Sequence, residues 1–298
     1  MGGILIVNKH AGVTSHDIVY KIRRLYGTKQ VGHTGTLDPM AEGVLVMLVG
    51  GAVKASEYLV CHEKSYEAGL RLGIETDTED VTGAVLRESA EVPSPKEVFS
   101  VCQRFVGEGE QIPPMYSALK VGGRKLCDLA REGVEIAREP RPITIFSLDA
   151  EATGKEREYR LAVHCSSGTY IRTLCADIGS ALGCGGAMSF LRRTSAGEIS
   201  LADAKSIDEL SAMTEEEREG LLLPVETLFV SLPELHFPAF YERLCKNGCE
   251  IYLKKISRTD LTEGARLRLC DKDGFFALGE VRSYPDGLAV KAIKFFRQ

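Results

Sequence analysis

The stretch VGHTGTLDPMAEGVL, residues 31–45, decides how the rest of the chain is arranged. It contains three glycines and one proline, and it runs into an apolar segment at 44–49. Glycine permits backbone angles that other residues avoid, and Pro39 disfavours helical geometry at Asp38. We therefore expect Asp38 on an irregular loop that leads into a buried strand, where a rigid scaffold can hold a reactive side chain. Taken alone, an aspartate before a proline is more often a turn former.

The composition is that of an ordinary soluble globular protein. Of the 298 residues, 44% are hydrophobic and 27% are charged, so one large and one small domain are expected. The sequence has no apolar run near the roughly eighteen residues that span a bilayer. Residues 1–9 have the pattern of an opening β-strand, with its apolar run at 4–7, and lack the basic stretch that begins a signal peptide. We expect a cytoplasmic protein with no membrane partner.

The nine cysteines are scattered, and none of them forms a CxxC pair. Cys245 and Cys249 are the only close pair, so we expect free thiols in a reducing cell. A metal-dependent hydrolase that uses Asp38 and the three histidines within residues 10–33 is an alternative hypothesis. The spacing of these histidines matches no ligand pattern that we can defend. We expect no metal and no other cofactor.

Charge is distributed unevenly along the chain. The net charge of the whole sequence is −5, which argues mildly against a nucleic-acid partner. Residues 236–298, however, contain twelve Lys and Arg against eight Asp and Glu, a net charge of +4. The preceding 235 residues contain 25 cationic and 34 acidic residues, a net charge of −9. The C-terminal segment is therefore a basic module on an acidic body, as expected where a local patch contacts phosphates.

Two further stretches have informative patterns. Residues 111–124, QIPPMYSALKVGGR, combine two prolines, two glycines and two cations, which indicates an extended loop. A strand predicted over 158–165 enters SSGTYIRTL, and an apolar helical face then continues over 171–182 to Gly183. Arg172 lies off that face in the first turn. The pattern alone therefore predicts an exposed arginine.

The remaining segments predict ordinary structural elements. Capping boxes begin three further helices, at Thr14–Asp17, Ser94–Glu97 and Ser206–Glu209. The acidic turn at 75–80 lacks the glycine and closing glutamate of a calcium loop, so we expect it to be solvated. Residues 223–233 have the pattern of a linker. Three short strands within 265–294, separated by Asp-Gly turns, predict a small basic β-barrel.

The string GHTGTLDPxAxGVL at 32–45 closely resembles the signature of the TruB family of tRNA pseudouridine synthases. Further similar motifs occur over roughly residues 3–230: KxY at 64–66, QxPPxYSAxKxxG at 111–123, SxGTYIRxL at 166–174 and FLRRT at 190–194. The resemblance implies an α+β pseudouridine synthase fold, with a mixed, largely antiparallel sheet flanked by helices and loops. The catalytic domain would span 1–232, with an RNA-clasping insertion at about 111–142. A small PUA-like β-barrel, which the family uses to bind RNA, would span 233–298.

The resemblance also implies three catalytic residues. Asp38 stands where the family has its catalytic aspartate, and Arg172 stands where an arginine forms an ion pair with it. Tyr66 stands where a tyrosine packs against the target uracil, although its strand pattern alone predicts a core residue. A bidentate guanidinium is well suited to keep the Asp38 carboxylate ionised and aimed.

Other positions are implied to contact the substrate. His33 either fills the space that the flipped base leaves or simply packs within its loop. Tyr170 would lie beneath the active site, and Leu191 would form part of its floor. The candidate RNA-binding cations are Lys9, Lys120, Arg124, Arg141 and Arg192.

The implied reaction is the isomerisation of uridine 55 in the T loop of tRNA to pseudouridine. A stacked base cannot turn within folded RNA, so the nucleotide must be extruded into a pocket. We expect a monomer that binds the T stem-loop of tRNA without a guide RNA. A non-catalytic RNA-binding protein on the same scaffold is the alternative, and the joint presence of Asp38, Tyr66 and Arg172 argues against it. The sequence leaves open whether Asp38 attacks the sugar, attacks the base or removes a proton.

Overall fold

The computed structural model describes residues 2–58, 63–91, 93–117 and 119–297, and a mixed sheet is its main feature. The strand order is β1-β3-β12-β4-β11-β10-β7, with β2 beside β3 and β13 beside β12. Neighbouring strands are antiparallel except for β3 and β12, which confirms the expected largely antiparallel sheet. The strands are β1 (Gly2–Lys9), β2 (Val31–His33), β3 (Glu42–Gly50), β4 (Lys64–Leu72), β7 (Gly107–Gln111), β10 (Arg141–Ala152), β11 (Glu158–Cys165), β12 (Gly186–Ala196) and β13 (Ile199–Ser200).

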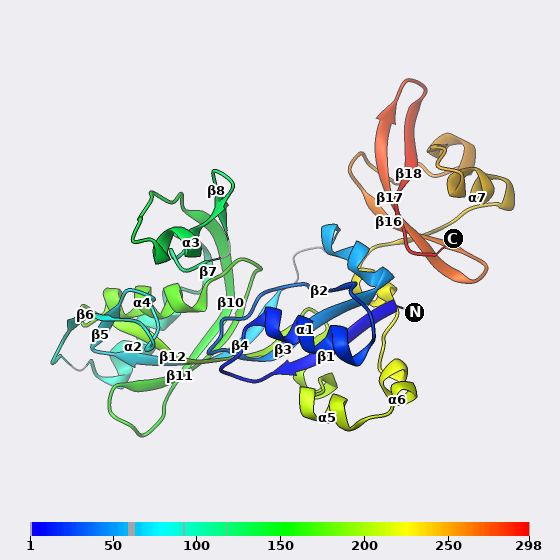
Figure 1. Cartoon of the computed structure of the whole chain (residues 1–298). Helices are drawn as coiled ribbons and strands as arrows, with labels where there is room; N and C mark the ends of the chain where they lie inside the picture. The colour runs from blue at the N-terminus through cyan, green and yellow to red at the C-terminus, as the bar shows by residue number, and fades with distance from the viewer. Residues whose placement is uncertain (1, 59–62, 92, 118, 298) are drawn as a thin grey trace.

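The three longest helices among the described residues bury their apolar sides in one core cluster with this sheet, to which the shorter α5 (Ile207–Ala212) adds Ile207 and Leu210. The three are α1 (Ser15–Leu25), α2 (Pro95–Gln103) and α4 (Ile171–Ala181). Figure 1 shows α1 near β1, β2 and β3, and α2 and α4 toward the other end of the sheet. The predicted capping boxes at Thr14–Asp17 and Ser94–Glu97 form with reciprocal hydrogen bonds. The helices therefore begin where the local sequence predicts.

The opposite face of β1 and β3 packs against the C-terminal part of the chain. Ile4 shares a buried cluster with Phe229 and Phe275. Phe229 is fully buried at the end of the short 3-10 helix η3 (Val225–Phe229), which lies within the expected linker at 223–233. The linker is therefore part of an apolar core, because its Leu and Phe side chains find partners on both sides.

The C-terminal sheet has the order β14-β16-β17-β18-β15. Its strands are β14 (Glu234–His236), β15 (Ile251–Tyr252), β16 (Arg266–Asp271), β17 (Gly274–Tyr284) and β18 (Gly287–Phe295), with α7 (Ala239–Lys246) beside them. The turn at Asp286-Gly287 forms as predicted, with Gly287 at a φ of +117°. This small curled sheet fits a PUA-like module (Figure 1).

The expected insertion lies between β7 and β10 and projects from the sheet in Figure 1. It contains a short hairpin, β8 (Lys120–Val121) and β9 (Arg124–Lys125), followed by α3 (Leu126–Arg131). A second hairpin, β5 (Ile74–Thr76) and β6 (Val85–Glu88), follows β4. The remaining elements are η1 (Gly51–Glu57), η2 (Leu201–Asp203), α5 (Ile207–Ala212), α6 (Glu215–Gly220) and η4 (Leu253–Ile256). Within the described ranges, none of the helices has the length and apolar character needed to cross a bilayer.

Candidate active site

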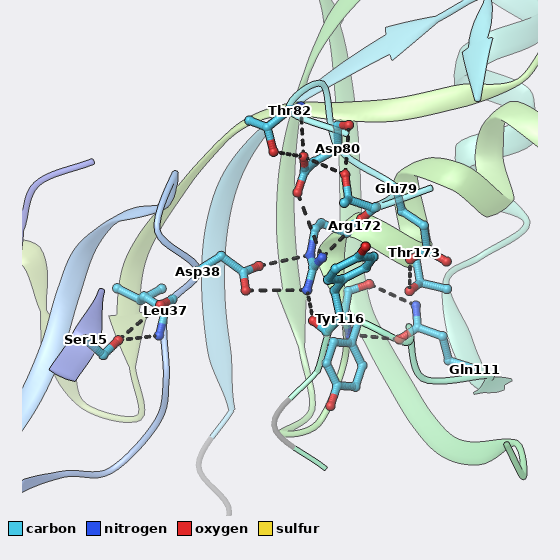
Figure 2. Close-up of polar contacts among 12 residues, drawn as sticks. Ser15, Leu37, Asp38, Glu79, Asp80, Thr82, Gln111, Tyr116, Arg172 and Thr173 are labelled. Atoms are coloured by element: carbon cyan, nitrogen blue, oxygen red, sulfur yellow. Dashed lines mark hydrogen bonds and ion pairs between the residues drawn. The ribbon is translucent and has the colours of Figure 1, made fainter. Parts of the chain in front are cut away.

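Asp38 lies on the irregular loop between β2 and β3, as predicted from the glycines and Pro39. The first residue of α1 fastens this loop from one side. The Ser15 hydroxyl donates to the Leu37 carbonyl at 3.1 Å and accepts from the Leu37 N–H at 2.9 Å (Figure 2). The carbonyl of Asp38 also accepts from the Ala41 N–H at 3.0 Å. These contacts fix the backbone on both sides of the carboxylate.

Lys9 fastens the same loop from within the protein. Its side chain is fully buried, and its ammonium donates to the carbonyls of Ala41, His10 and Pro39 at 2.6, 3.0 and 3.2 Å. Burial lowers the pKa of Lys9 to about 8, although the negative charges of Asp38 and Glu42 act in the opposite direction. The ammonium therefore holds the Asp38 loop from the protein interior, and the substrate contact expected of Lys9 stays a prediction.

Arg172 holds the Asp38 carboxylate with two prongs (Figure 2). Its Nε lies 3.0 Å from Oδ2, and its Nη2 lies 3.4 Å from Oδ1. Two other guanidinium hydrogens are donated to the carbonyls of Tyr116 at 2.7 Å and Thr78 at 3.0 Å. Arg172 is 5% exposed. The ion pair implied by the resemblance is thus present, and the exposed arginine that the helical pattern alone predicted is not.

Burial raises the pKa of Asp38 above the ordinary range of an aspartate. The cation of Arg172 acts against this rise, while the nearby carboxylate of Asp80 adds to it. Burial makes this carboxylate a stronger base than one in water, and the guanidinium of Arg172 favours its ionised form.

Asp80 is a residue of this site that sequence reasoning missed. Its Oδ2 lies 3.8 Å from Arg172 Nη1, on the side away from Asp38 (Figure 2). Its Oδ1 accepts from the Thr82 hydroxyl at 2.5 Å, and from the Thr82 N–H and the Thr78 hydroxyl at 2.9 Å. Asp80 is 5% exposed, so the acidic turn at 75–80 is not wholly solvated as expected. The threonines two residues to either side were the available signal.

Tyr66 pairs across the sheet with Arg193, from β4 to β12. The tyrosine is buried, its hydroxyl lies within hydrogen-bonding reach of the Arg193 guanidinium, and burial raises its pKa, so the phenol is neutral. Arg193 also donates to the carbonyls of Val44 at 2.7 Å and Gly35 at 3.0 Å. Sequence reasoning did not select Arg193. The alternation of a strand puts Arg193 on the same face as Leu191, but only the register of β12 against β4 shows that this face meets the cavity.

A cavity of about 300 Å³ lies beside Asp38. Five of the predicted site residues line it: Asp38, Tyr66, Tyr170, Arg172 and Leu191. The other lining residues are Thr34, Gly35, Thr36, Leu37, Lys64, Tyr116, Ser117, Ser167, Gly168, Thr169, Ile171 and Arg193. Two larger hollows lie along β7 and β10 and beside the insertion hairpin, and neither contains the Asp38–Arg172 pair. The smaller cavity is therefore the one with catalytic potential.

The other predicted contacts do not line this cavity. His33 is half-buried on β2, and its Nδ1 has no hydrogen-bond partner among the described residues. Burial, Arg193 and His16 lower the pKa of His33, so its imidazole is neutral. Lys120, Arg124 and Arg141 lie outside the cavity, and Lys120 and Arg124 line the hollow beside the insertion hairpin. They lie on the insertion hairpin and at the start of β10, where all three side chains are exposed.

Arg192 lies on the face of the sheet opposite to the cavity. It pairs across the strands with Glu67, whereas its neighbour Arg193 pairs with Tyr66, and successive side chains on a strand point to opposite faces. Its guanidinium contacts Glu42 at 2.6 Å and Glu67 at 3.6 Å. Arg192 is therefore engaged with two surface carboxylates away from the pocket.

One group of side chains in the described ranges is close enough to hold a metal ion. It consists of Glu234, His236 and Cys270 in the C-terminal sheet, not of Asp38 and the histidines within residues 10–33. The Arg268 guanidinium lies 3.1 Å from Glu234, so a cation already neutralises this carboxylate. The eight cysteines in the described ranges are free thiols, and Cys61 lies outside those ranges.

Two family models match the chain over adjacent ranges. Residues 23–171 match the TruB family pseudouridylate synthase (N terminal domain). Residues 172–230 match the tRNA pseudouridylate synthase B C-terminal domain. The boundary between these two matches falls directly before Arg172, at the start of α4.

Similar curated proteins share most of their length with this chain. The tRNA pseudouridine synthase B of Alkaliphilus oremlandii is 47% identical over 252 residues, which is 85% of this chain and 83% of that protein. The protein of the same name from Dechloromonas aromatica is 47% identical over 232 residues, 78% and 77% of the two chains.

A solved structure with a similar fold is a Cbf5-Nop10-Gar1 complex, with a TM-score of 0.74 and 25% identity over 99% of this chain and 84% of that one. An archaeal box H/ACA sRNP Nop10-Cbf5 complex has a TM-score of 0.73 and 22% identity over 99% and 86%. The latter likeness concerns the fold alone. Both extend over the C-terminal sheet as well as the sheet that holds Asp38.

Proposed function

The chain belongs to the TruB family of pseudouridylate synthases, and from this we propose that it converts uridine 55 in the T loop of tRNA to pseudouridine, with Asp38 as catalytic residue. The observation that supports this most is the two-pronged pair between Asp38 and Arg172 beside a cavity that Tyr66 also lines. A carboxylate, a fixed cation and an aromatic wall are what the reaction needs in one place.

The reaction breaks the bond between N1 of the base and C1′ of the sugar, and it forms a bond between C5 and C1′. The hydrogen on C5 is lost and N1 ends protonated, so the product is an isomer of the substrate. The balance requires no oxidant, no phosphoryl donor and no other co-reactant, which agrees with the expectation of no cofactor. The base must leave its stack to turn, and the cavity beside Asp38 is where we propose that it turns.

Each pocket residue has a role that follows from its surroundings. Arg172 keeps Asp38 ionised and aimed against the rise in pKa that burial causes. Tyr66, a neutral buried phenol, offers its ring as a wall for the uracil. Leu191 and Tyr170 add apolar and aromatic surface that excludes water. Lys9 acts indirectly, because its three carbonyl contacts hold the loop that carries Asp38.

RNA contacts outside the pocket are proposed at two places. Lys120, Arg124 and Arg141 on the insertion and beside it would contact the T stem-loop. The PUA-like domain, residues 233–298, would add to binding through its basic surface. The catalytic domain would then be residues 1–232. Because phosphate contacts release counterions, binding should weaken steeply with salt.

We further propose a protein-only, monomeric enzyme of the cytoplasm. The relatives matched over most of their length carry the name tRNA pseudouridine synthase B, whereas the Cbf5 structures are complexes with additional proteins. The T stem-loop alone would thus be sufficient as substrate.

The direct test is to incubate the purified chain with a full-length tRNA transcript and with an isolated T-arm, without guide RNA or partner protein. Because the isomer has the same mass as uridine, the RNAs are first tagged with a carbodiimide that stays on pseudouridine. Mass-spectrometric mapping should then find the tag at uridine 55 of the tRNA and at the corresponding uridine of the T-arm. Modification of the tRNA at a different position would contradict the proposed substrate. Modification that appears only after a guide RNA is added would contradict the protein-only mechanism.

A further inference from the structure

Gln111, the last residue of β7, connects the insertion to the helix that carries Arg172. It is 4% exposed, and both ends of its amide contact the backbone of Tyr170. Its Oε1 accepts from the Tyr170 N–H at 2.8 Å, and its Nε2 donates to the Tyr170 carbonyl at 3.0 Å (Figure 2). Gln111 is far from Tyr170 in sequence, so this contact fixes two distant segments against each other.

The contact lies where α4 begins. Tyr170 is the N-cap residue of α4, and its own side chain makes no capping hydrogen bond. Helix starts are usually fixed by a local Ser, Thr, Asp or Asn. Here an amide from β7 holds the N-cap backbone instead. Arg172 follows two residues later, so the position of its backbone depends on this hold.

The segment that follows Gln111 reaches Arg172 itself. The carbonyl of Tyr116 accepts from Arg172 Nη2 at 2.7 Å, the shortest contact of this guanidinium among the described residues (Figure 2). From the far side of the insertion, Arg138 donates to the carbonyl of Pro113 at 3.1 Å. The entry and exit of the insertion are therefore tied together at Pro113, three residues before the carbonyl that contacts Arg172.

We propose that Gln111 is a positioning residue that couples the RNA-clasping insertion to the Asp38–Arg172 pair. When Gln111 holds the start of the insertion against Tyr170, the first turn of α4 is fixed in position. The Tyr116 carbonyl then directs the Arg172 guanidinium toward Asp38. RNA that contacts the insertion stabilises this position of Arg172. RNA that fills the pocket without contacting the insertion is turned over slowly. The proposal rests on the function proposed above, since it concerns the same reaction.

The test is Gln111→Met, which keeps the length of the side chain and removes both amide contacts. Gln103→Met is the matched control, because Gln103 also donates to a main-chain carbonyl, that of Leu148 in β10. With saturating T-arm RNA, the single-turnover rate of Gln111→Met should fall by about 10- to 100-fold, the loss expected from a small misplacement of a catalytic group. Its Kd for RNA and the rate of Gln103→Met should stay close to native values.

Two further readouts separate positioning from a general loss of structure. The acid limb of the pH–rate profile should move to higher pH in Gln111→Met, because a displaced Arg172 stabilises the Asp38 carboxylate less. In an Arg172→Lys background, Gln111→Met should add little further loss, since the two changes act on one interaction. An unshifted acid limb or fully additive losses would overturn the proposal, as would a native rate. Failure of the native chain to modify the T-arm would instead refute the proposed function.

Discussion

Two neighbouring arginines of β12 lie on opposite faces of the strand and have different surroundings. Arg193 is buried on the cavity side, where its guanidinium contacts Val44, Gly35 and Tyr66. Arg192 is exposed on the other side, where it contacts the carboxylates of Glu42 and Glu67. An arginine thus forms buried hydrogen bonds that fix the backbone on one face, and ordinary surface ion pairs on the other.

The difference shows where the protein places buried charge. Lys9, Arg172 and Arg193 are all buried around the Asp38 loop, and each donates to at least two main-chain carbonyls. Burial of a charge is unfavourable unless its hydrogen bonds are satisfied, so such groups are fixed in position when they occur. Exposed pairs contribute little and tolerate change. Substitutions on the two faces should therefore have very different effects.

The largest loss among the supporting residues is expected for Arg172→Met. It removes both prongs from Asp38 and leaves two carboxylates, Asp38 and Asp80, without their shared cation. We expect the single-turnover rate to fall by about 100- to 1,000-fold, as for loss of one preorganised electrostatic partner. Arg71→Met, which removes a surface arginine near Glu158, is the matched control. Near-native turnover by Arg172→Met, with native RNA affinity, would mean that the pair is not needed.

The burial of Lys9 should make the stability of the protein depend on pH. Its folded pKa of about 8 lies below the model-compound value of 10.5, so between these values the unfolded chain binds more protons than the folded one. Stability must then rise with pH in this window. Relative to Lys9→Met, the free energy of unfolding of the native chain should rise by roughly 3 kcal/mol from pH 7.5 to 10.5. Parallel urea unfolding at both pH values measures this, and a constant difference would exclude a depressed pKa.

A smaller effect is expected for Asp80→Asn. The amide can still accept from Thr82, but it no longer offers a charge to Arg172, so the guanidinium is less tightly oriented. We expect a loss of about tenfold in single-turnover rate with unchanged RNA affinity. Asp77→Asn is the control, because the Asp77 carboxylate belongs to the same hairpin and accepts from the Ala84 N–H at 2.7 Å. Equal losses in both variants would indicate a role for the hairpin as a whole.

The smallest effect is expected for Arg192→Ala. This change breaks two exposed ion pairs on the face away from the cavity, and we expect a stability within about 0.5 kcal/mol of native. The rate and the RNA affinity should also be native. A marked loss of RNA affinity would show that this face contacts RNA, which is the role predicted for Arg192 from the sequence. It would also remove the contrast between the two faces of β12.

Local elements were largely predictable from sequence. The loop that holds Asp38, the capped helices and the Asp-Gly hairpin follow from the preferences of a few adjacent residues, and the structure confirms them. The resemblance to the TruB family identified Arg172 as a site residue, whereas the helical pattern of its segment alone predicted an exposed side chain. Its burial depends on the carbonyls of Thr78 and Tyr116, which are distant in sequence, and no local pattern reports such contacts.

Asp80 and Arg193 were missed for the same reason. An acidic turn has the composition of a solvated loop whether or not an arginine from another segment lies against it. Arg192 and Arg193 are adjacent and chemically alike, and only the register of β12 against β4 determines which one faces the cavity. The linker at 223–233 likewise looks free in sequence, although Phe229 is buried between two sheets.

The central claim is that Asp38, held by Arg172, performs the isomerisation. The most direct measurement is tritium release from T-arm RNA labelled at C5 of its uridines, by the native chain and by Asp38→Asn, each at saturating protein. We predict release by the native chain alone, and binding of RNA by Asp38→Asn with nearly native affinity. Release by Asp38→Asn at the native rate, with the same RNA bound equally well, would contradict the claim.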